Sequence, residues 1–224
     1  QIGGGQIQAL SATTLKSLWI SEKLGGQTLS PITCKNGYIY TGTWNSDTTP
    51  GSYFCLSVTD EDPSKGNEIK YCTWKYDHKG GFYWAGAYAS GDYLVFGSDD
   101  GSAEGNYTNT SILYSVSIST GVMLDKLTGL KGDIRTSVAY NNGYVYFATK
   151  GGYLYRVKMN PDGTFGQVLG YNLGGMATAT PVIYKGRVYV LDYNESLNSD
   201  ALRCFSLESG KELWRRWYRV PMKR

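Results

Sequence analysis

Thr180-Pro181-Val182-Ile183-Tyr184-Lys185-Gly186-Arg187-Val188-Tyr189 is one of four copies of a short pattern in this 224-residue chain. The pattern is an apolar stretch, a turn with glycine, and a second apolar stretch rich in tyrosine. The other copies occupy residues 30–40, 84–94 and 136–146. The turn glycines are Gly37, Gly91, Gly143 and Gly186, so the steps between copies are 54, 52 and 43 residues. This spacing indicates an internal repeat built from short strands.

A second pattern recurs between these copies. Residues 7–19, 113–123, 154–165 and 202–214 each contain a strand that is apolar on both faces, then a polar turn and another strand. The turns Ser119-Thr120-Gly121 and Pro161-Asp162-Gly163 are typical of hairpins, because glycine accepts a positive φ. Strands that are apolar on both faces lie between two neighbouring sheets. The two patterns together predict an all-β fold, a β-propeller whose blades are four-stranded antiparallel sheets.

The repeats divide the chain, read as one propeller segment over residues 1–224, into blades. Four complete blades are expected at residues 30–79, 84–131, 135–175 and 180–217, a half blade of two outer strands at 1–26, and a basic tail at 218–224. No strand pair is left to complete the half blade. Sheet edges and blade faces would then be uncovered, so we expect either missing blades of a larger propeller or self-association.

Composition argues against several classes of partner. The formal net charge is +3, which is too small to indicate a nucleic-acid partner, although residues 214–224 are basic and aromatic. No apolar run reaches 18 residues, so we expect no transmembrane segment. The run Asp99-Asp100-Gly101 lacks the alternating aspartates of a calcium loop and indicates a turn.

The cysteines and the single histidine do not form a recognisable metal or disulfide pattern. Cys55 and Cys204 occupy the same place in their repeats, which favours buried free thiols. The alternative is a disulfide between Cys55 and Cys72 across a hairpin centred on residues 63–64, which is awkward for directly opposed residues. There is no Cys-x-x-Cys motif, and His78 alone does not indicate a metal site.

The run Ser206-Leu207-Glu208-Ser209-Gly210-Lys211-Glu212-Leu213-Trp214, which follows the quoted copy, resembles the repeat of pyrroloquinoline-quinone-like (quinoprotein-type) β-propellers. The resemblance covers essentially the whole chain and is clearest in the first and last copies. Residues 78–88 with 57–64 also resemble uncharacterised surface proteins of Gram-positive gut bacteria. That second resemblance implies an extracellular or cell-surface protein with a non-catalytic role, although this chain carries no signal peptide.

The resemblance does not imply the cofactor. Quinoprotein dehydrogenases hold theirs with adjacent cysteines, a stacking tryptophan and a calcium site of Glu, Asn and Asp. This chain has no adjacent cysteines and no such acidic set on the expected inner strands, so we expect no cofactor and no metal. No catalytic residue is identified, because the lone histidine has no recognisable partners and no Gly-x-Ser-x-Gly motif is present. A quinoprotein-like enzyme without recognisable cofactor ligands is the weakest alternative.

The candidate ligand-binding site is the mouth of the central channel. Alignment of the repeats places Tyr83 and Arg135 at the same level of neighbouring inner strands. The second repeat has Phe82, Tyr83 and Trp84 where the others have small residues, and His78 lies just before them. Aromatic faces beside a cation suit a sugar ring or an anionic group.

A structural interpretation competes with this one. Phe82 and Trp84 would then fill the space between blades, and Asp133 would pair with Arg135.

The sequence as a whole favours a non-catalytic scaffold or recognition module that interacts with a protein or a cell-surface polymer. A glycan- or small-ligand-binding module that uses the channel mouth is the alternative.

Overall fold

The computed structural model describes residues 4–219, and within them the regular structure is entirely β. Nineteen strands form five sheets. One sheet comprises β1 (Gln8–Leu10), β2 (Ser17–Ser21) and β6 (Glu68–Lys70). The next two contain β3 (Thr33–Lys35), β4 (Tyr38–Gly42), β5 (Gly51–Ser57) and β7 (Trp74–His78), then β8 (Tyr88–Ala89), β9 (Tyr93–Gly97), β10 (Ser111–Ser117) and β11 (Met123–Leu130). The last two contain β12 (Ala139–Asn141), β13 (Tyr144–Ala148), β14 (Tyr153–Met159) and β15 (Phe165–Asn172), then β16 (Val182–Tyr184), β17 (Arg187–Asn194), β18 (Ser199–Ser206) and β19 (Glu212–Arg219).

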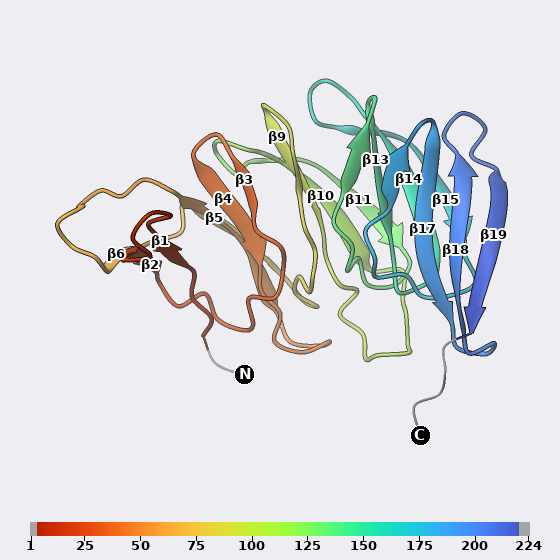
Figure 1. Cartoon of the computed structure of the whole chain (residues 1–224), viewed down its shortest axis with the longest axis horizontal. Coiled ribbons are helices and arrows are strands. Elements are labelled where there is room, and N and C mark those ends of the chain that lie inside the picture. Colours follow the sequence, from red (N-terminus) through yellow and green to blue (C-terminus); the bar gives the residue numbers. More distant parts are fainter. Residues whose placement is uncertain (1–3, 220–224) are drawn as a thin grey trace.

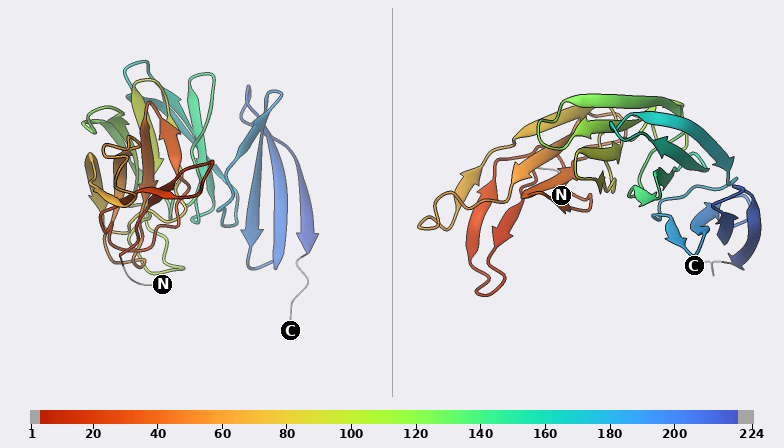
Figure 2. Two further views of the ribbon diagram at one scale, coloured as in Figure 1. Left: turned by 60° about the vertical axis from the view of Figure 1, so that its left-hand side comes forward. Right: turned by 90° about the horizontal axis from the view of Figure 1, so that it is seen from above.

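The five sheets follow one another along an arc (Figure 1). Viewed from above in Figure 2, the sheet β1–β2–β6 lies at one end of the arc and β16–β19 at the other. The short first strand of each four-stranded sheet faces the concave side, and the last strand faces the convex side (Figure 2). This radial arrangement confirms the predicted β-propeller. Among residues 4–219 there is no helix of the length and apolarity needed to cross a membrane.

Glycine-containing turns join the first two strands of each four-stranded sheet. Asn36-Gly37, Asn142-Gly143 and Lys185-Gly186 have a positive φ at both residues, between 45° and 81°, which is what a type I′ hairpin turn requires. The fourth turn is built differently, since Gly91 has no positive φ. There the Ser90 hydroxyl oxygen accepts hydrogen bonds from the backbone N–H groups of Asp92 and Tyr93.

The hydrophobic core lies between consecutive sheets. The layer between β3–β7 and β8–β11 contains Tyr40, Phe82 and Phe96, each fully buried. Phe147 belongs to the layer between β8–β11 and β12–β15, and Val190 to the layer between β12–β15 and β16–β19. Trp19 belongs to the layer between the first sheet and β3–β7. Burial between sheets explains why the central strands are apolar on both faces.

The connection from β5 to β7 corrects one prediction. The sequence predicted a simple hairpin centred on residues 63–64 and only two strands in the half blade. Instead, residues 58–73 form a long excursion in which β6 pairs in parallel with β2. The first sheet therefore has three strands.

The register of β5 and β7 also settles the cysteine arrangement. Cys55 lies opposite Trp74 rather than opposite Cys72. All four cysteines are free thiols, and Cys55 and Cys204 are buried as expected. Cys34 is exposed and Cys72 is half-buried.

Candidate functional site

Four strand connections meet at one end of the propeller, and their side chains form the candidate site. They are the β4–β5, β7–β8, β9–β10 and β11–β12 connections. The guanidinium of Arg135, in the β11–β12 connection, contacts Asp47 in the β4–β5 connection and Asp99 just after β9. Tyr83 and Trp84 belong to the β7–β8 connection. Antiparallel strand order brings these connections to the same end of their sheets.

Three aromatic rings form a continuous stack, which we call the aromatic platform: Trp44, Tyr83 and Trp84. The ring centroids of Trp44 and Tyr83 are 4.7 Å apart with an interplanar angle of 30°. Those of Tyr83 and Trp84 are 4.3 Å apart at 20°. Trp84 is 43% exposed, so the platform presents apolar ring surface to solvent.

Trp84 is held in an unusual backbone conformation. Its φ is 58°, in the left-handed region that costs a bulky residue about 1–2 kcal/mol. Stacking on Tyr83 offsets part of this cost, because aromatic pairs contribute about 0.5–1.5 kcal/mol beyond burial. Strain of this kind concentrates at binding sites, where the surrounding structure fixes the residue.

Arg135 packs against the Tyr83 ring of the platform. Its guanidinium carbon is 4.7 Å from the centroid of the Tyr83 ring, a cation–π distance. The same group is 6% exposed and forms ion pairs with Asp47 at 3.0 Å, Asp99 at 2.8 Å and Asp133 at 3.0 Å. Three carboxylates thus surround one guanidinium, so the positive charge of Arg135 is compensated within the protein.

Two of the three carboxyl groups around Arg135, those of Asp99 and Asp133, have a raised pKa. Burial, together with the neighbouring Asp133, raises the pKa of Asp99 well above its usual range, although Arg135 opposes the shift. Burial likewise raises the pKa of Asp133 to about 6, and Arg135 again opposes it. One carboxylate oxygen of Asp99 is buried without a hydrogen-bond partner among the described residues, as expected where carboxylates crowd one cation.

Two of the residues predicted for the site lie beneath its surface. Phe82 has no exposed surface and packs edge-on against Tyr53 at a centroid distance of 5.3 Å, between the two sheets. His78 is half-buried, and its Nδ1 accepts a hydrogen bond from the Gly80 N–H at 3.2 Å. Burial lowers the pKa of His78 to about 4. The exposed part of the predicted set is therefore Trp84, supported by Tyr83 and Arg135.

A glycine pair positions the β7–β8 connection. A Cβ atom on Gly80 would lie 2.4 Å from the backbone nitrogen of Gly101, and one on Gly81 would lie 3.0 Å from the carbonyl oxygen of Thr43. The backbone can approach both neighbouring connections only because these side chains are absent. The Phe82 N–H donates to the Thr43 carbonyl at 2.9 Å, which fixes the start of the platform segment.

Sequence reasoning missed Trp44 and Asp47. Both lie in the β4–β5 connection, outside the repeated pattern, so alignment of the repeats does not bring them to Tyr83. The nearest sequence signal is the tryptophan itself, which directly follows a predicted strand. By contrast, the alignment did place Tyr83 and Arg135 at one level, and the structure has them in contact.

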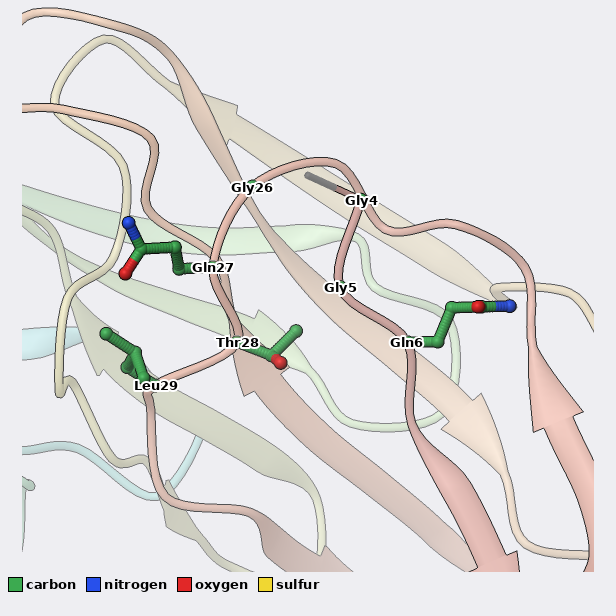
Figure 3. Close-up of a pocket in the computed structure, with 7 residues that line it drawn as sticks. All are labelled: Gly4, Gly5, Gln6, Gly26, Gln27, Thr28 and Leu29. Atoms are coloured by element: carbon green, nitrogen blue, oxygen red, sulfur yellow. The ribbon is translucent and has the colours of Figure 1, made fainter. Parts of the chain in front are cut away.

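A groove lies between residues 4–6 and residues 26–29 (Figure 3). Its volume is about 400 Å³, and Gly4, Gly5, Gln6, Gly26, Gln27, Thr28 and Leu29 line it. Gln27 and Trp44 exchange two backbone hydrogen bonds of 2.8 and 3.1 Å in an antiparallel bridge. Residues directly opposed in such a bridge project to the same side. The Gln27 side chain therefore lies on the side of the Trp44 ring, and in Figure 3 Leu29 projects the same way.

The described residues do not suggest a metal centre, because no group of three His, Cys, Asp or Glu side chains among residues 4–219 is placed to hold an ion. Asp100, in the acidic run after β9, instead accepts backbone hydrogen bonds from Ser102 at 2.8 Å and Thr108 at 2.7 Å. This is the turn that the sequence indicated.

No family model and no curated protein sequence matches the chain. Among solved structures, BamB from Moraxella catarrhalis is similar with a TM-score of 0.66 at 16% identity, over 95% of this chain and 55% of BamB. The computationally designed Ika8 protein is similar with a TM-score of 0.67 at 14% identity, over 95% of this chain and 56% of its own. The chain spans just over half the length of each. These similarities support the fold, and the chain is a β-propeller protein.

Proposed function

We propose that this chain is a non-catalytic propeller scaffold that recognises a protein or a cell-surface polymer through the end that carries the aromatic platform. One observation carries the proposal. Trp84 exposes 43% of its surface while its backbone is held at a φ of 58°. Packing of a hydrophobic core does not require a solvent-exposed ring on a strained backbone. Strain and exposed apolar surface of this kind are typical of binding sites.

The polar groups near the platform support binding rather than catalysis. Arg135 is engaged by three carboxylates. His78 has a pKa lowered to about 4 by burial, so it is neutral at physiological pH and poorly suited to exchange protons there. Arg135 instead packs against the Tyr83 ring of the platform, and His78 packs against the buried Phe82 ring.

A location outside the cell is part of the proposal. It rests on the resemblance of residues 78–88 and 57–64 to bacterial surface proteins and on the quinoprotein-type repeat at 206–214. The similarity to BamB supports the propeller fold that the proposal requires.

The experiment is retention of the purified chain by a whole envelope preparation from a Gram-positive bacterium, measured by depletion from solution. Trp84→Ala should abolish retention. Tyr71→Ala is the matched control, since Tyr71 is a 70% exposed aromatic residue next to β6, and it should bind like the unmodified chain. Equal retention of both variants, or no retention of the unmodified chain, would contradict the proposal.

Folding of the Trp84 variant needs its own check. Trp84→Gly removes the stacked ring but also relieves the left-handed strain, so we expect the free energy of unfolding to change by less than about 1 kcal/mol. Urea denaturation measures it. A large loss of stability would show that the ring is part of the core rather than a binding surface.

A further inference from the structure

We infer that the cleft between the sheets β12–β15 and β16–β19 binds a small organic carboxylate, whose charged group pairs with Arg156. The cleft has a volume of about 390 Å³, within the range of small-ligand sites. The β12–β13, β16–β17 and β18–β19 turns contribute to its lining. Because strands alternate in direction, these turns lie at the opposite end of the sheets from the connections that carry the aromatic platform. The site is therefore separate from the proposed recognition surface.

Arg156 occupies a position that holds a small side chain in the other four-stranded sheets. In each sheet, one residue of the third strand lies directly opposite the third residue of the second strand. It is Cys55 in β5, Ser115 in β10 and Cys204 in β18, each at most 1% exposed, and it is Arg156 in β14. The fold itself therefore does not require a cation at this position.

The face on which Arg156 lies makes the replacement more unusual. Arg156 is opposite Tyr146, and opposed residues of a sheet project to the same side. Tyr146 packs in the apolar layer between β12–β15 and β16–β19. A guanidinium thus takes the place of a small side chain at the edge of an apolar layer, where a charge needs a partner.

The guanidinium of Arg156 has no such partner among residues 4–219. Its Nε is buried without a hydrogen-bond partner. Among these residues the arginine ion pairs are those of Arg135, Arg203 and Arg215, and Arg156 forms none. The fully buried arginines, Arg135 and Arg203, are each paired with a carboxylate, at 2.8 and 2.6 Å. An unpaired and partly buried cation destabilises a fold, so the cleft favours a ligand that brings the missing carboxylate.

The Tyr144 ring holds the guanidinium ready for such a ligand. The guanidinium carbon of Arg156 is 4.0 Å from the centroid of this ring, a cation–π contact. The contact leaves the terminal N–H groups unused, and their planar fork matches the two oxygens of a carboxylate. Tyr144, Tyr146 and Leu207 also line the cleft. Their apolar surface suits the body of an organic acid better than an inorganic anion.

The charges of the lining favour a ligand with a single negative charge. Arg156 is the basic side chain of the lining, and Glu208, in the β18–β19 turn, is the acidic one. Glu208 is exposed whereas Arg156 is half-buried, so water screens the carboxylate more than the guanidinium. Lys185 and Lys211 are exposed in the β16–β17 and β18–β19 turns, and their charges attract an anion to this end of the propeller.

Ligand-observed NMR titration of the purified chain with phenylacetate and with hexanoate tests the inference. We expect saturable binding of at least one of them, and at least tenfold weaker binding of phenylacetamide, the neutral analogue of phenylacetate. Arg156→Ser should weaken carboxylate binding tenfold or more, and it introduces the residue that β10 has as Ser115. Arg156→Lys should weaken binding several-fold, because lysine keeps the charge but not the planar fork. It carries the test if urea denaturation shows that Arg156→Ser does not fold.

Arg216→Ser is the matched control and should bind like the unmodified chain. Arg216 is exposed on β19 and aligns across the sheet with Leu202 and Leu191. Val190, next to Leu191, packs toward β12–β15. Because successive residues of a strand point to opposite faces, Arg216 lies on the face turned away from the cleft.

The remaining outcomes separate the carboxylate from other ligands. Failure of both carboxylates to bind, equal binding of phenylacetamide, or unchanged binding by the Arg156 variants would overturn the inference. Glu208→Gln should strengthen carboxylate binding, because it removes a like charge from the lining; weaker binding would show that the cleft holds a cationic group instead. Sodium phosphate is the inorganic probe, and tighter binding of phosphate than of either carboxylate would also overturn the assignment.

Discussion

Arg135 and His78 are two buried or half-buried polar residues that support the connection carrying Tyr83 and Trp84. Both are polar side chains that the sequence offered as ligand contacts. The structure makes Arg135 the centre of a buried ion network and places His78 beneath the surface, next to Phe82 at a centroid distance of 6.1 Å. Their effect on the surface is indirect: Arg135 contacts the Tyr83 ring, and His78 accepts a hydrogen bond from Gly80 in the same connection.

The buried titratable groups predict opposite changes in the pH dependence of stability. Asp133 has a pKa raised to about 6 by burial, so its contribution is present below its unfolded pKa and is lost as pH rises through 6. His78 has a pKa lowered to about 4, so the unfolded chain binds the extra proton and stability rises with pH between about 4 and 6.5. In the window from about pH 4 to 6 the two slopes therefore have opposite signs.

Urea denaturation at several pH values in this window measures the two contributions. Relative to the unmodified chain, His78→Gln should lose stability more steeply as pH rises, by at most about 1.4 kcal/mol per pH unit, and Asp133→Asn should lose it less steeply. Asp133 also raises the pKa of Asp99, so the change in Asp99 titration in Asp133→Asn alters the slope in the same direction as the loss of Asp133 itself. Slopes parallel to that of the unmodified chain would show that neither group has the shifted pKa.

At the scale of elements, the β7–β8 connection determines whether the platform forms. It passes between the β4–β5 and β9–β10 connections, and the Asp99 N–H donates to the Gly81 carbonyl at 3.0 Å. The glycines of the repeat and those of this connection look alike in sequence. Only the structure separates them: a Cβ atom on Gly91 would meet no other atom within 4 Å, whereas one on Gly80 would lie 2.4 Å from the backbone of Gly101.

The contrast predicts the effect of adding one methyl group. Gly80→Ala should lower the free energy of unfolding by about 1–3 kcal/mol through overpacking and should weaken the near-ultraviolet circular dichroism of the stacked aromatic rings. Gly91→Ala is the control, since neither residue has a positive φ, and its stability should be unchanged or slightly higher. Equal losses for both variants would contradict a specific role for the close approach at Gly80.

At the scale of the whole molecule, the sequence predicted the propeller because the same strand and turn patterns repeat along the chain. Apolar residues on both faces and glycine-containing turns recur in each of the four-stranded blades, and each has a local physical cause. The excursion that carries β6 and the platform residue Trp44 were missed because they lie in connections that occur once. The site depends on contacts across 88 positions of sequence, such as Arg135 with Asp47, which no repeat encodes.

The same periodicity identifies an open sheet face. Trp74 and Trp214 occupy equivalent places, opposite Cys55 and Cys204 respectively. The Trp74 ring lies against the next sheet, where a Cβ on Gly121 would be 2.5 Å from its Cγ. Trp214 is 41% exposed, and Leu191 on the same sheet is 47% exposed. An apolar face that another sheet covers elsewhere in the fold favours association.

We therefore expect this chain to self-associate through the face of β16–β19 that carries Leu191. Val188 and Val190 pack against the preceding sheet, so Leu191 points to the opposite face. Leu191→Asp should weaken association at least tenfold, about 1.4 kcal/mol, in sedimentation velocity over a range of concentrations. Leu197→Asp is the control, because Leu197 is 59% exposed in the β17–β18 turn and lies outside the strands of that face. A monomer at all concentrations, or equal weakening by both substitutions, would show that the face does not drive association.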